Sequence, residues 1–366
     1  MPELKTSLVS VCSMIFMRPP TSDRYSAVSY RLHDRNQSVF ELRHFPTGAI
    51  LITLVLSIVE AAIRVAIIGQ QAFGKATLEA FLARGDTVAG VFSAPEKGRP
   101  DPLRLAAETA GVPVHMFPRL TTQDAQDVLR AAAVDVAIMA FVTQFVSQPF
   151  CAIPRFGTIQ FHPSLLPAHR GASSLGWAII LGRTETGFSI FRPTDGLDEG
   201  PLILQRAVPI HPDDTVRSLY FDRIFPMGIA GLLEAADQVV AGTASEHAQP
   251  ETGAGYEGII GEAEARINWA SHIDITYNLI RGCNPAPGAW TTQEGRKLIL
   301  FDCEKLTAGT FTKVKGQRIG EIVAADGKTI TIHGQGGFIV VQRLKLEGGQ
   351  KIPAGDAGLH VGTLLA

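Results

Sequence analysis

An alternation of short apolar runs and helical stretches, beginning near Arg64, is the feature that most constrains the fold of this chain. Residues 65–68 are apolar and mostly β-branched, which is typical of a buried strand. A helical stretch over residues 75–84 follows and ends at Gly85, and residues 87–92 form a second apolar run. A strand, a helix and a strand in this order predict an α/β fold with a parallel sheet and crossover helices.

The same alternation continues along the chain. We expect further helices over residues 102–110 and 123–133, and further strands over residues 112–116, 134–141, 157–161 and 201–208. Residues 215–240 are expected to be mostly helical, with Asp213 and Asp214 as caps.

Gly69 and Gly74 lie between the first expected strand and its helix. A dinucleotide-binding loop needs a glycine two residues after the first, where this chain has Gln71, and a P-loop would end in Lys followed by Ser or Thr. We therefore expect a tight turn here, and no NAD.

The last third of the chain has a different composition and a different pattern of apolar segments. Residues 241–258 are rich in Gly, Ala, Pro and Thr, which indicates a linker. Short β-like segments divided by glycines follow over residues 297–301, 320–323, 329–333 and 337–344. They are typical of a small β domain such as a barrel. We thus expect a poorly defined extension over residues 1–62, an α/β domain over 63–258 and a β domain over 259–366.

The first sixty residues contain an apolar run over residues 49–59, ended by Glu60. The run is shorter than the roughly 20 residues that span a membrane. It lies too deep in the chain for a signal peptide, and five acidic residues through Glu60 argue against a transit peptide. Two alternatives are open: a leader with no packed role, or an extension whose apolar run packs as a helix.

The bulk composition limits the partners of the protein. A hydrophobic content of 46% and a net charge of -2 are typical of a soluble globular protein without the electrostatic signature of non-specific nucleic-acid binding. Four cysteines (Cys12, Cys151, Cys283, Cys303) form no C-x-x-C pair, which favours free thiols in the cytoplasm. The histidines show no metal-ligand spacing. We expect no metal and no membrane, and the oligomeric state is open.

His162 and Asp198 are the candidate chemical groups. His162 ends an apolar strand and leads into a proline-rich loop, and ligands gather beyond the carboxyl ends of strands in open α/β sheets. Asp198 lies in a turn between Gly196 and Gly200. A carboxylate there can hold the imidazole in one tautomer and favour its charged form. Taken singly, His162 is better explained as a satisfied histidine at a strand end and Asp198 as a turn-forming aspartate.

In combination, these segments resemble the formyltransferase family that uses 10-formyltetrahydrofolate, over almost everything from Arg64 to Ala366. Within the family the chain is more similar to the hydrolase domain of 10-formyltetrahydrofolate dehydrogenase than to methionyl-tRNA formyltransferase. The similar segments are residues 64–69, 162–171, 187–191, 212–215, 256–259, 267–269, 281–282 and 287–290.

The resemblance implies a Rossmann-like domain with a parallel-rich sheet and the folate site, followed by a small OB-like β domain. It implies that His162 is the catalytic histidine and Asp198 the essential aspartate. It also implies that Gln144, Phe145 and Val146 hold the pterin of the folate, partly through backbone groups. Ser164 and Arg170 are further expected folate-binding residues. Arg192 and Arg281 are alternatives to Arg170 for the folate glutamate tail, whereas His169 is expected to be a surface residue.

The implied chemistry is attack on the formyl carbonyl, which creates negative charge on its oxygen. His162 can stabilise that oxygen and pass a proton, while Asp198 keeps it charged or helps to deprotonate the attacking water or amine. The family usually carries Asn where this chain has Gln160. Glutamine keeps the amide donor one methylene further out, and catalytic geometry is sensitive to shifts of about 1 Å. Gln160 is therefore either a catalytic donor, with normal or altered activity, or a polar residue without a catalytic role.

The expected function is an enzyme of one-carbon metabolism that releases or transfers the formyl group of 10-formyltetrahydrofolate. The acceptor is water or an amine, and methionyl-tRNA formylation is the chief amine alternative. A catalytically impaired folate-binding module is a further alternative, suggested by Gln160. A complete dehydrogenase is not expected, because the 366 residues leave no room for a carrier or an aldehyde dehydrogenase domain.

Overall fold

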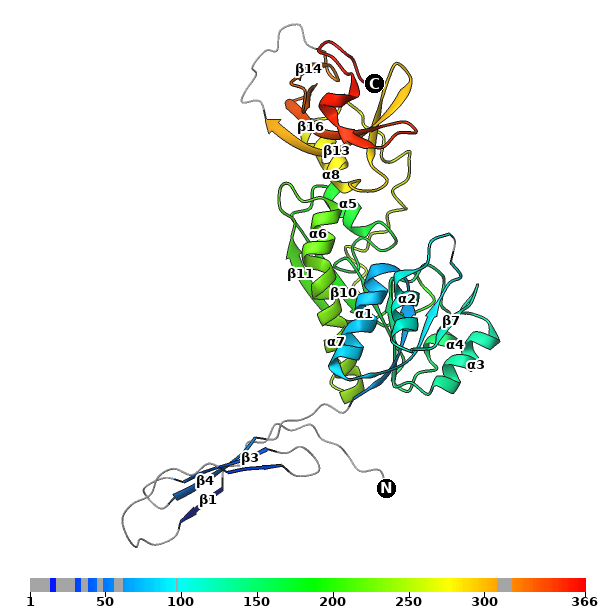
Figure 1. Cartoon of the computed structure of the whole chain (residues 1–366), viewed down its shortest axis with the longest axis vertical. Helices are drawn as coiled ribbons and strands as arrows, with labels where there is room; N and C mark the ends of the chain where they lie inside the picture. Colours follow the sequence, from blue (N-terminus) through cyan, green and yellow to red (C-terminus); the bar gives the residue numbers. More distant parts are fainter. Residues whose placement is uncertain are drawn as a thin grey trace. The chain divides into compact units, whose positions relative to one another are not determined.

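The computed structural model describes residues 62–96, 98–307 and 318–366 throughout, and before residue 62 it describes the backbone of four strands. The chain divides into two compact units, Met1–Ala62 and Ile63–Ala366 (Figure 1). Cys12 and most of the expected extension lie outside the described residues.

The four strands before residue 62 form an antiparallel sheet in the order β1-β4-β3-β2. They are β1 (Met14–Met17), β2 (Tyr30–His33), β3 (Val39–His44) and β4 (Ala49–Val55). The expected helix over the apolar run is wrong, because Ala49–Val55 is a strand. Four of its seven residues are Ile, Thr or Val, whose branched side chains favour a strand over a helix.

The second unit begins with a seven-stranded sheet in the order β11-β10-β9-β8-β5-β6-β7. Its parallel strands are β5 (Arg64–Gly69), β6 (Thr87–Ser93), β7 (Val114–Met116), β8 (Val136–Ala140) and β9 (Thr158–His162). Strand β10 (Glu185–Phe191) pairs antiparallel with β9 on one side and with the edge strand β11 (Leu202–Pro209) on the other. The predicted parallel-rich α/β fold is confirmed.

Helices cover both faces of this sheet (Figure 1). In β5, Val65 and Ile67 face one core and Ala66 and Ile68 face the other, as the alternation of a strand requires. The first core also contains side chains of α1 (Gln71–Arg84), α2 (Pro102–Thr109), α5 (Ser174–Ile180) and α7 (Phe225–Ala241). The second core contains side chains of α3 (Gln123–Ala132) and α4 (Gln148–Cys151). The near-continuous apolar strands reflect this two-sided burial.

Gly69 and Gly74 allow the close approach of neighbouring elements. A Cβ on Gly69 would lie 1.9 Å from the Ala140 carbonyl oxygen, and one on Gly74 would lie 2.9 Å from a Leu103 methyl group. The Asp101 carboxylate accepts the Gln71 N–H at the start of α1 and the Leu103 N–H at the start of α2. Gly69 and Gly74 therefore allow the turn between β5 and α1 to pack against β8 and α2.

The expected helix over residues 215–240 is present but interrupted. It consists of α6 (Val216–Leu219), a π-helical segment η1 (Tyr220–Ile224) and α7. Thr215 caps α6 in a reciprocal pair with Ser218, so the predicted caps are wrong. Asp214 instead accepts the Ser218 hydroxyl, and Asp213 accepts the Tyr277 hydroxyl. The segment Val216–Ala241 is apolar and long enough to cross a membrane, but its buried residues pack into the first core.

The last part of the unit is an antiparallel sheet in the order β12-β13-β16-β15-β14, with β17 beside β16. The strands are β12 (Ala289–Gln293), β13 (Arg296–Thr307), β14 (Ile322–Ala325), β15 (Ile330–Gly334), β16 (Gly337–Leu346) and β17 (Lys351–Pro353). The 3₁₀ helix η2 (Ala354–Ala357) follows, and α8 (Ile273–Gly282) packs on the sheet. An antiparallel β domain is thus confirmed, while its OB-like character stays a prediction. Sequence reasoning did not identify α5, α8, β10 or β12.

Candidate active site

A cavity of about 810 Å³ opens beyond the carboxyl ends of β8 and β9. This is the edge at which open α/β sheets bind ligands. Its wall is formed by the segments after these strands, by the turn after β10, and by residues at the starts of α1, α5, α6 and η1. Tyr256 and Ile259, in the segment between α7 and α8, complete it. The lining side chains used below are Phe73, Phe141, Gln144, Phe145, Val146, Gln160, His162, Asp198, Tyr220, Tyr256 and Ile259.

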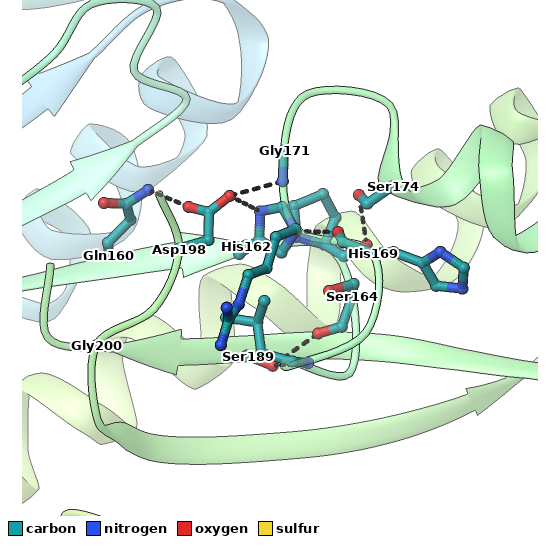
Figure 2. Close-up of polar contacts among 12 residues, drawn as sticks. Gln160, His162, Ser164, His169, Gly171, Ser174, Ser189, Asp198 and Gly200 are labelled. Atoms are coloured by element: carbon teal, nitrogen blue, oxygen red, sulfur yellow. Dashed lines mark hydrogen bonds and ion pairs between the residues drawn. The ribbon is translucent and has the colours of Figure 1, made fainter. Parts of the chain in front are cut away.

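His162 is the last residue of β9 and is 5% exposed. Its Nε2 lies 2.9 Å from the backbone oxygen of His169 (Figure 2). Since a carbonyl oxygen only accepts hydrogen bonds, Nε2 carries the hydrogen, and in the neutral ring Nδ1 carries the lone pair. Nδ1 lies 3.5 Å from Asp198 Oδ2, which is longer than a good hydrogen bond. In the neutral ring Nδ1 is therefore a base adjacent to a carboxylate.

Asp198 is held by two donors. Its Oδ2 accepts the Gly171 N–H at 2.9 Å, and its Oδ1 accepts the Gln160 amide at 3.3 Å (Figure 2). Gln160 and His162 are two residues apart on β9, so both side chains lie on one face of the sheet. The backbone of Asp198 has φ 53, a left-handed conformation that Asp tolerates better than most residues. The structure thus brings the three predicted catalytic residues together.

Burial lowers the pKa of His162, and the nearby Asp198 carboxylate opposes this shift only in part. The charged form of an enclosed imidazole loses its hydration, so the neutral ring is favoured. Asp198 favours the charged form, as expected, but burial has the larger effect and the net shift of the pKa is downward. The tautomer is also set by the His169 carbonyl and not by Asp198, because the carbonyl is the group within hydrogen-bond distance.

Ser164 lies outside the cavity wall and is fully buried. Its hydroxyl donates to the Ala168 carbonyl at 2.7 Å, while its own carbonyl accepts the Ser189 hydroxyl at 2.7 Å. Ser189 also accepts the Leu166 N–H at 3.0 Å and the Gln205 amide at 2.9 Å. Within this network Ser164 shapes the loop between His162 and Arg170 (Figure 2).

None of the three candidate arginines lines the cavity. Arg170 donates to Gln249 Oε1 at 2.9 Å and lies 3.6 Å from Glu199. Arg192 donates to the Phe156 carbonyl, and Arg281 is buried and donates to the Asp214 carbonyl, each at 2.7 Å. The prediction that His169 is a surface residue is wrong, because it is buried with Nδ1 3.1 Å from Glu257 Oε2.

The loop after β8 contributes all three predicted pterin-binding residues to the cavity wall. Gln144 bonds backbone groups of the protein, accepting the Leu120 N–H at 3.0 Å and donating to the Phe117 carbonyl at 3.4 Å. Phe145 is 59% exposed, whereas Val146 is buried. This leaves an exposed aromatic ring and a backbone fixed by Gln144 for contact with a flat ligand.

Six aromatic lining residues carried no predicted site role: Phe73, Phe141, Phe161, Phe191, Tyr220 and Tyr256. The position of Phe141 directly after a buried strand was a usable signal, because ligands bind at such ends. Tyr256 lies in the segment predicted as a linker, and although residues 256–259 resemble the family, that resemblance was given no site role. Within the described part of the chain, no three His, Cys, Asp or Glu side chains are grouped to hold a metal ion.

Comparison with known proteins identifies two family matches. Residues 62–235 match the family Formyl transferase, and residues 259–358 match Formyl transferase, C-terminal domain. The chain is 36% identical over 323 residues to mitochondrial 10-formyltetrahydrofolate dehydrogenase of Mus musculus, covering 86% of this chain and 34% of that protein. It is 32% identical over 304 residues to methionyl-tRNA formyltransferase of Geotalea uraniireducens (strain Rf4), covering 81% and 94%.

The chain therefore spans about a third of the length of the dehydrogenase relatives. Among solved structures, HypX from Aquifex aeolicus in complex with tetrahydrofolic acid superposes with a TM-score of 0.59 at 17% identity, covering 80% of this chain and 46% of HypX. WlaRD, a sugar 3N-formyl transferase, superposes with a TM-score of 0.57 at 16% identity, covering 79% and 98%. These two structures share the fold.

Proposed function

The chain belongs to the formyl transferase family, and on this basis we propose that it is an enzyme that removes the formyl group from 10-formyltetrahydrofolate, with water as the acceptor. The observation that carries the proposal is the buried His162, whose Nδ1 lies beside Asp198 in the wall of a large cavity. The similarity to 10-formyltetrahydrofolate dehydrogenases, at 36% and 39% identity, supports water as the acceptor.

In the proposed reaction, a water molecule attacks the formyl carbon. The water oxygen forms a bond to that carbon while a water proton moves to His162 Nδ1, which acts as the general base. Asp198 Oδ2, 3.5 Å from Nδ1, stabilises the imidazolium that forms. The bond from the formyl carbon to N10 then breaks, and the imidazolium returns its proton to N10. The products are tetrahydrofolate and formic acid, which ionises to formate.

Gln160 supports this arrangement in the free protein, since its amide N–H₂ donates to Asp198 Oδ1. The carboxylate is thereby held from both sides, by Gln160 and by the Gly171 N–H. We assign to Gln160 the orientation of Asp198, and to its second amide hydrogen the stabilisation of the developing oxyanion. The longer glutamine suits both roles because it spans from β9 to the Asp198 turn.

The folate is proposed to bind along the loop after β8, with its flat pterin against the backbone of residues 144–146. The exposed Phe145 ring supplies apolar surface at this wall. We further propose a cytoplasmic location, because Cys151 and Cys283 are buried as free thiols.

An amine acceptor is the second candidate. The similarity to methionyl-tRNA formyltransferase extends over 94% of that protein, so the two-domain arrangement alone does not favour water. In this case the same His162 would deprotonate the attacking amine. A folate-binding module without turnover is the third candidate, and it predicts binding without product.

The test is formation of tetrahydrofolate and formate from 10-formyltetrahydrofolate by the purified protein, with and without methionyl-tRNA. We expect turnover in water, and a loss of about 100-fold or more in His162→Ala, since a general base contributes about 10²–10⁴-fold. His360→Ala, at an exposed histidine, is the matched control and should retain activity.

Turnover only with the tRNA would replace the hydrolase by the transferase. Folate binding without any turnover would replace both enzymes by the folate-binding module.

A further inference from the structure

Residues 247–260, which overlap the predicted linker and are called the linker segment below, contact both halves of the candidate active site. It comes after α7 in the chain, and its first residue, His247, pairs with Leu202 of β11. At its other end the Ile260 N–H donates to the Ser173 hydroxyl at 3.1 Å. Between these points the Gly255 N–H donates to the Pro167 carbonyl at 3.1 Å, and the Arg170 N–H donates to the Gly255 carbonyl at 2.9 Å. The segment is thus bonded along the loop that follows His162.

On the histidine side, the contact passes through His169. Glu257 Oε2 lies 3.1 Å from His169 Nδ1. The His169 carbonyl accepts the His162 Nε2–H at 2.9 Å, a contact that Figure 2 shows. His169 has φ 56, a conformation that a non-glycine residue adopts only when its surroundings hold it there. The Glu257 contact fixes the His169 ring, and the His169 backbone presents the carbonyl that accepts the His162 Nε2–H.

On the aspartate side, the contact passes through Gln249. Its amide N–H₂ donates to the Asp198 carbonyl at 2.7 Å and to the Gly200 carbonyl at 2.8 Å. Its Oε1 accepts from Arg170 Nη2 at 2.9 Å. Asp198 also has a positive φ. One amide therefore fixes the turn that presents the carboxylate and links it to the histidine loop.

We propose that Gln249 and Glu257 are positioning residues of the reaction, holding Asp198 and His162 in the geometry that proton transfer needs. The inference rests on the proposed function of that pair. Neither side chain lines the cavity, so both act through the residues that they bind. The two roles require opposite chemistry: Glu257 must accept a hydrogen bond from His169, and Gln249 must donate two to the carbonyls of the turn.

This difference defines the Glu257 experiment. Glu257→Leu removes the acceptor, and a misplacement of about 1 Å costs on the order of 100-fold in rate, so we expect kcat to fall by about 10-fold to 100-fold. Glu257→Gln keeps an oxygen acceptor and is expected to stay within about threefold of the unaltered protein. KM for the folate should change little, because a lost transition-state interaction lowers kcat. Glu251→Leu, exposed in the same segment, is the matched control.

For Gln249, the conservative substitution Gln249→Glu is expected to lower the activity. Gln249→Glu keeps the acceptor for Arg170 but removes both donors and places a carboxylate against two carbonyl oxygens. We expect its kcat to fall at least as far as that of Gln249→Leu, by about tenfold or more. Equal activity of Gln249→Glu and the unaltered protein would overturn the role of Gln249, and so would a fall caused by unfolding, which thermal melting of each variant detects.

A measurement without substrate separates this inference from the proposed function. With ¹⁵N-labelled histidine, the His162 ring should show its proton on Nε2 in the unaltered protein and in Glu257→Gln, and a mixture of tautomers in Glu257→Leu. The same Nε2–H signal in all three proteins would overturn the inference even if the enzyme turns over. The absence of turnover in the unaltered protein, with the tautomer change observed, would instead overturn the proposed function alone.

Discussion

At the scale of single residues, the chemistry of the site follows from the two nitrogens of His162. The His169 carbonyl occupies Nε2, and Nδ1 is left beside Asp198. Burial favours the neutral ring, so the imidazolium that forms when Nδ1 gains a proton is destabilised by its loss of hydration. Asp198 reduces that destabilisation without removing it. A base of this kind can both accept a proton and release it again.

The lowered pKa of His162 predicts a dependence of stability on pH. The ordinary value for histidine is 6.5, and the pKa in the folded protein is lower. As the pH falls below about 6.5, the unfolded chain binds a proton at this position that the folded protein does not, so stability falls. We expect the urea midpoint to decrease between pH 7.5 and 5.5, with this one group contributing at most about 1.4 kcal/mol per pH unit.

The check is the same series with His162→Gln, which removes this titration and should show a shallower decrease. Only the difference between the two slopes is informative, because contributions that are common to both proteins cancel in it. Parallel slopes would contradict the assignment of a neutral, buried His162.

At the scale of elements, β9 supports the site because its two faces have different tasks. Gln160 and His162 face the site, while Phe161 points into the first core and stacks on Phe73 with centroids 4.3 Å apart. Gly228 of α7 lies directly against Phe161, and a Cβ there would approach the ring to 2.4 Å. The position of the catalytic strand therefore depends on a glycine of α7 that packs against the core-facing side chain of β9.

Gly228→Ala tests this packing. Helix propensity favours alanine by roughly 1 kcal/mol, but overpacking a dense core costs typically about 1–3 kcal/mol. We expect a net loss of stability and a loss of activity, measured by urea denaturation and by formate release. Ala230→Gly, on the exposed side of the same helix, should cost only about 0.5–1 kcal/mol and leave activity intact. A more stable Gly228→Ala protein would contradict the packing argument.

At the scale of the Ile63–Ala366 unit, α5 and α8 join the catalytic sheet to the C-terminal β domain (Figure 1). Their backbones approach closely, since a Cβ on Gly282 would lie 2.7 Å from the Gly176 carbonyl oxygen. Arg281 of α8 donates to the Asp214 carbonyl at 2.7 Å and to the His211 carbonyl at 3.4 Å, just before α6. Burial lowers the pKa of this guanidinium, and the nearby acidic groups oppose the shift.

Arg281→Met should loosen this junction. The change leaves the buried Asp214 carbonyl without its side-chain donor, at a cost of about 1–3 kcal/mol. We expect a lower urea midpoint and a broader transition, because the two halves would unfold less cooperatively. Arg296→Met, at an exposed arginine, is the control and should stay within about 0.5 kcal/mol. An unchanged midpoint in Arg281→Met would show that Arg281 does not stabilise this junction.

The sequence by itself located β5 to β9, α1 to α3 and β11 in the α/β part, because the spacing of apolar residues encodes which face of an element is buried. It also located His162 and Asp198, since a strand end and a glycine-flanked turn are local features. It did not locate α5 or β10. The strand over Ala49–Val55 was not identified, because a short apolar run suits a helix or a strand equally well without its partners.

Only the tertiary structure decided the state of the site. The His162 tautomer, the burial that lowers its pKa and the location of Ser164 outside the cavity all depend on contacts across the fold. His169 and Glu257 are 88 positions apart, and Asp198 and Gln249 are 51 apart. Such pairings arise from how the linker segment runs over the finished sheet, and no local spacing encodes them. The physical reason is that hydrogen bonding and desolvation are set by neighbours in space, whereas periodicity records only neighbours along the chain.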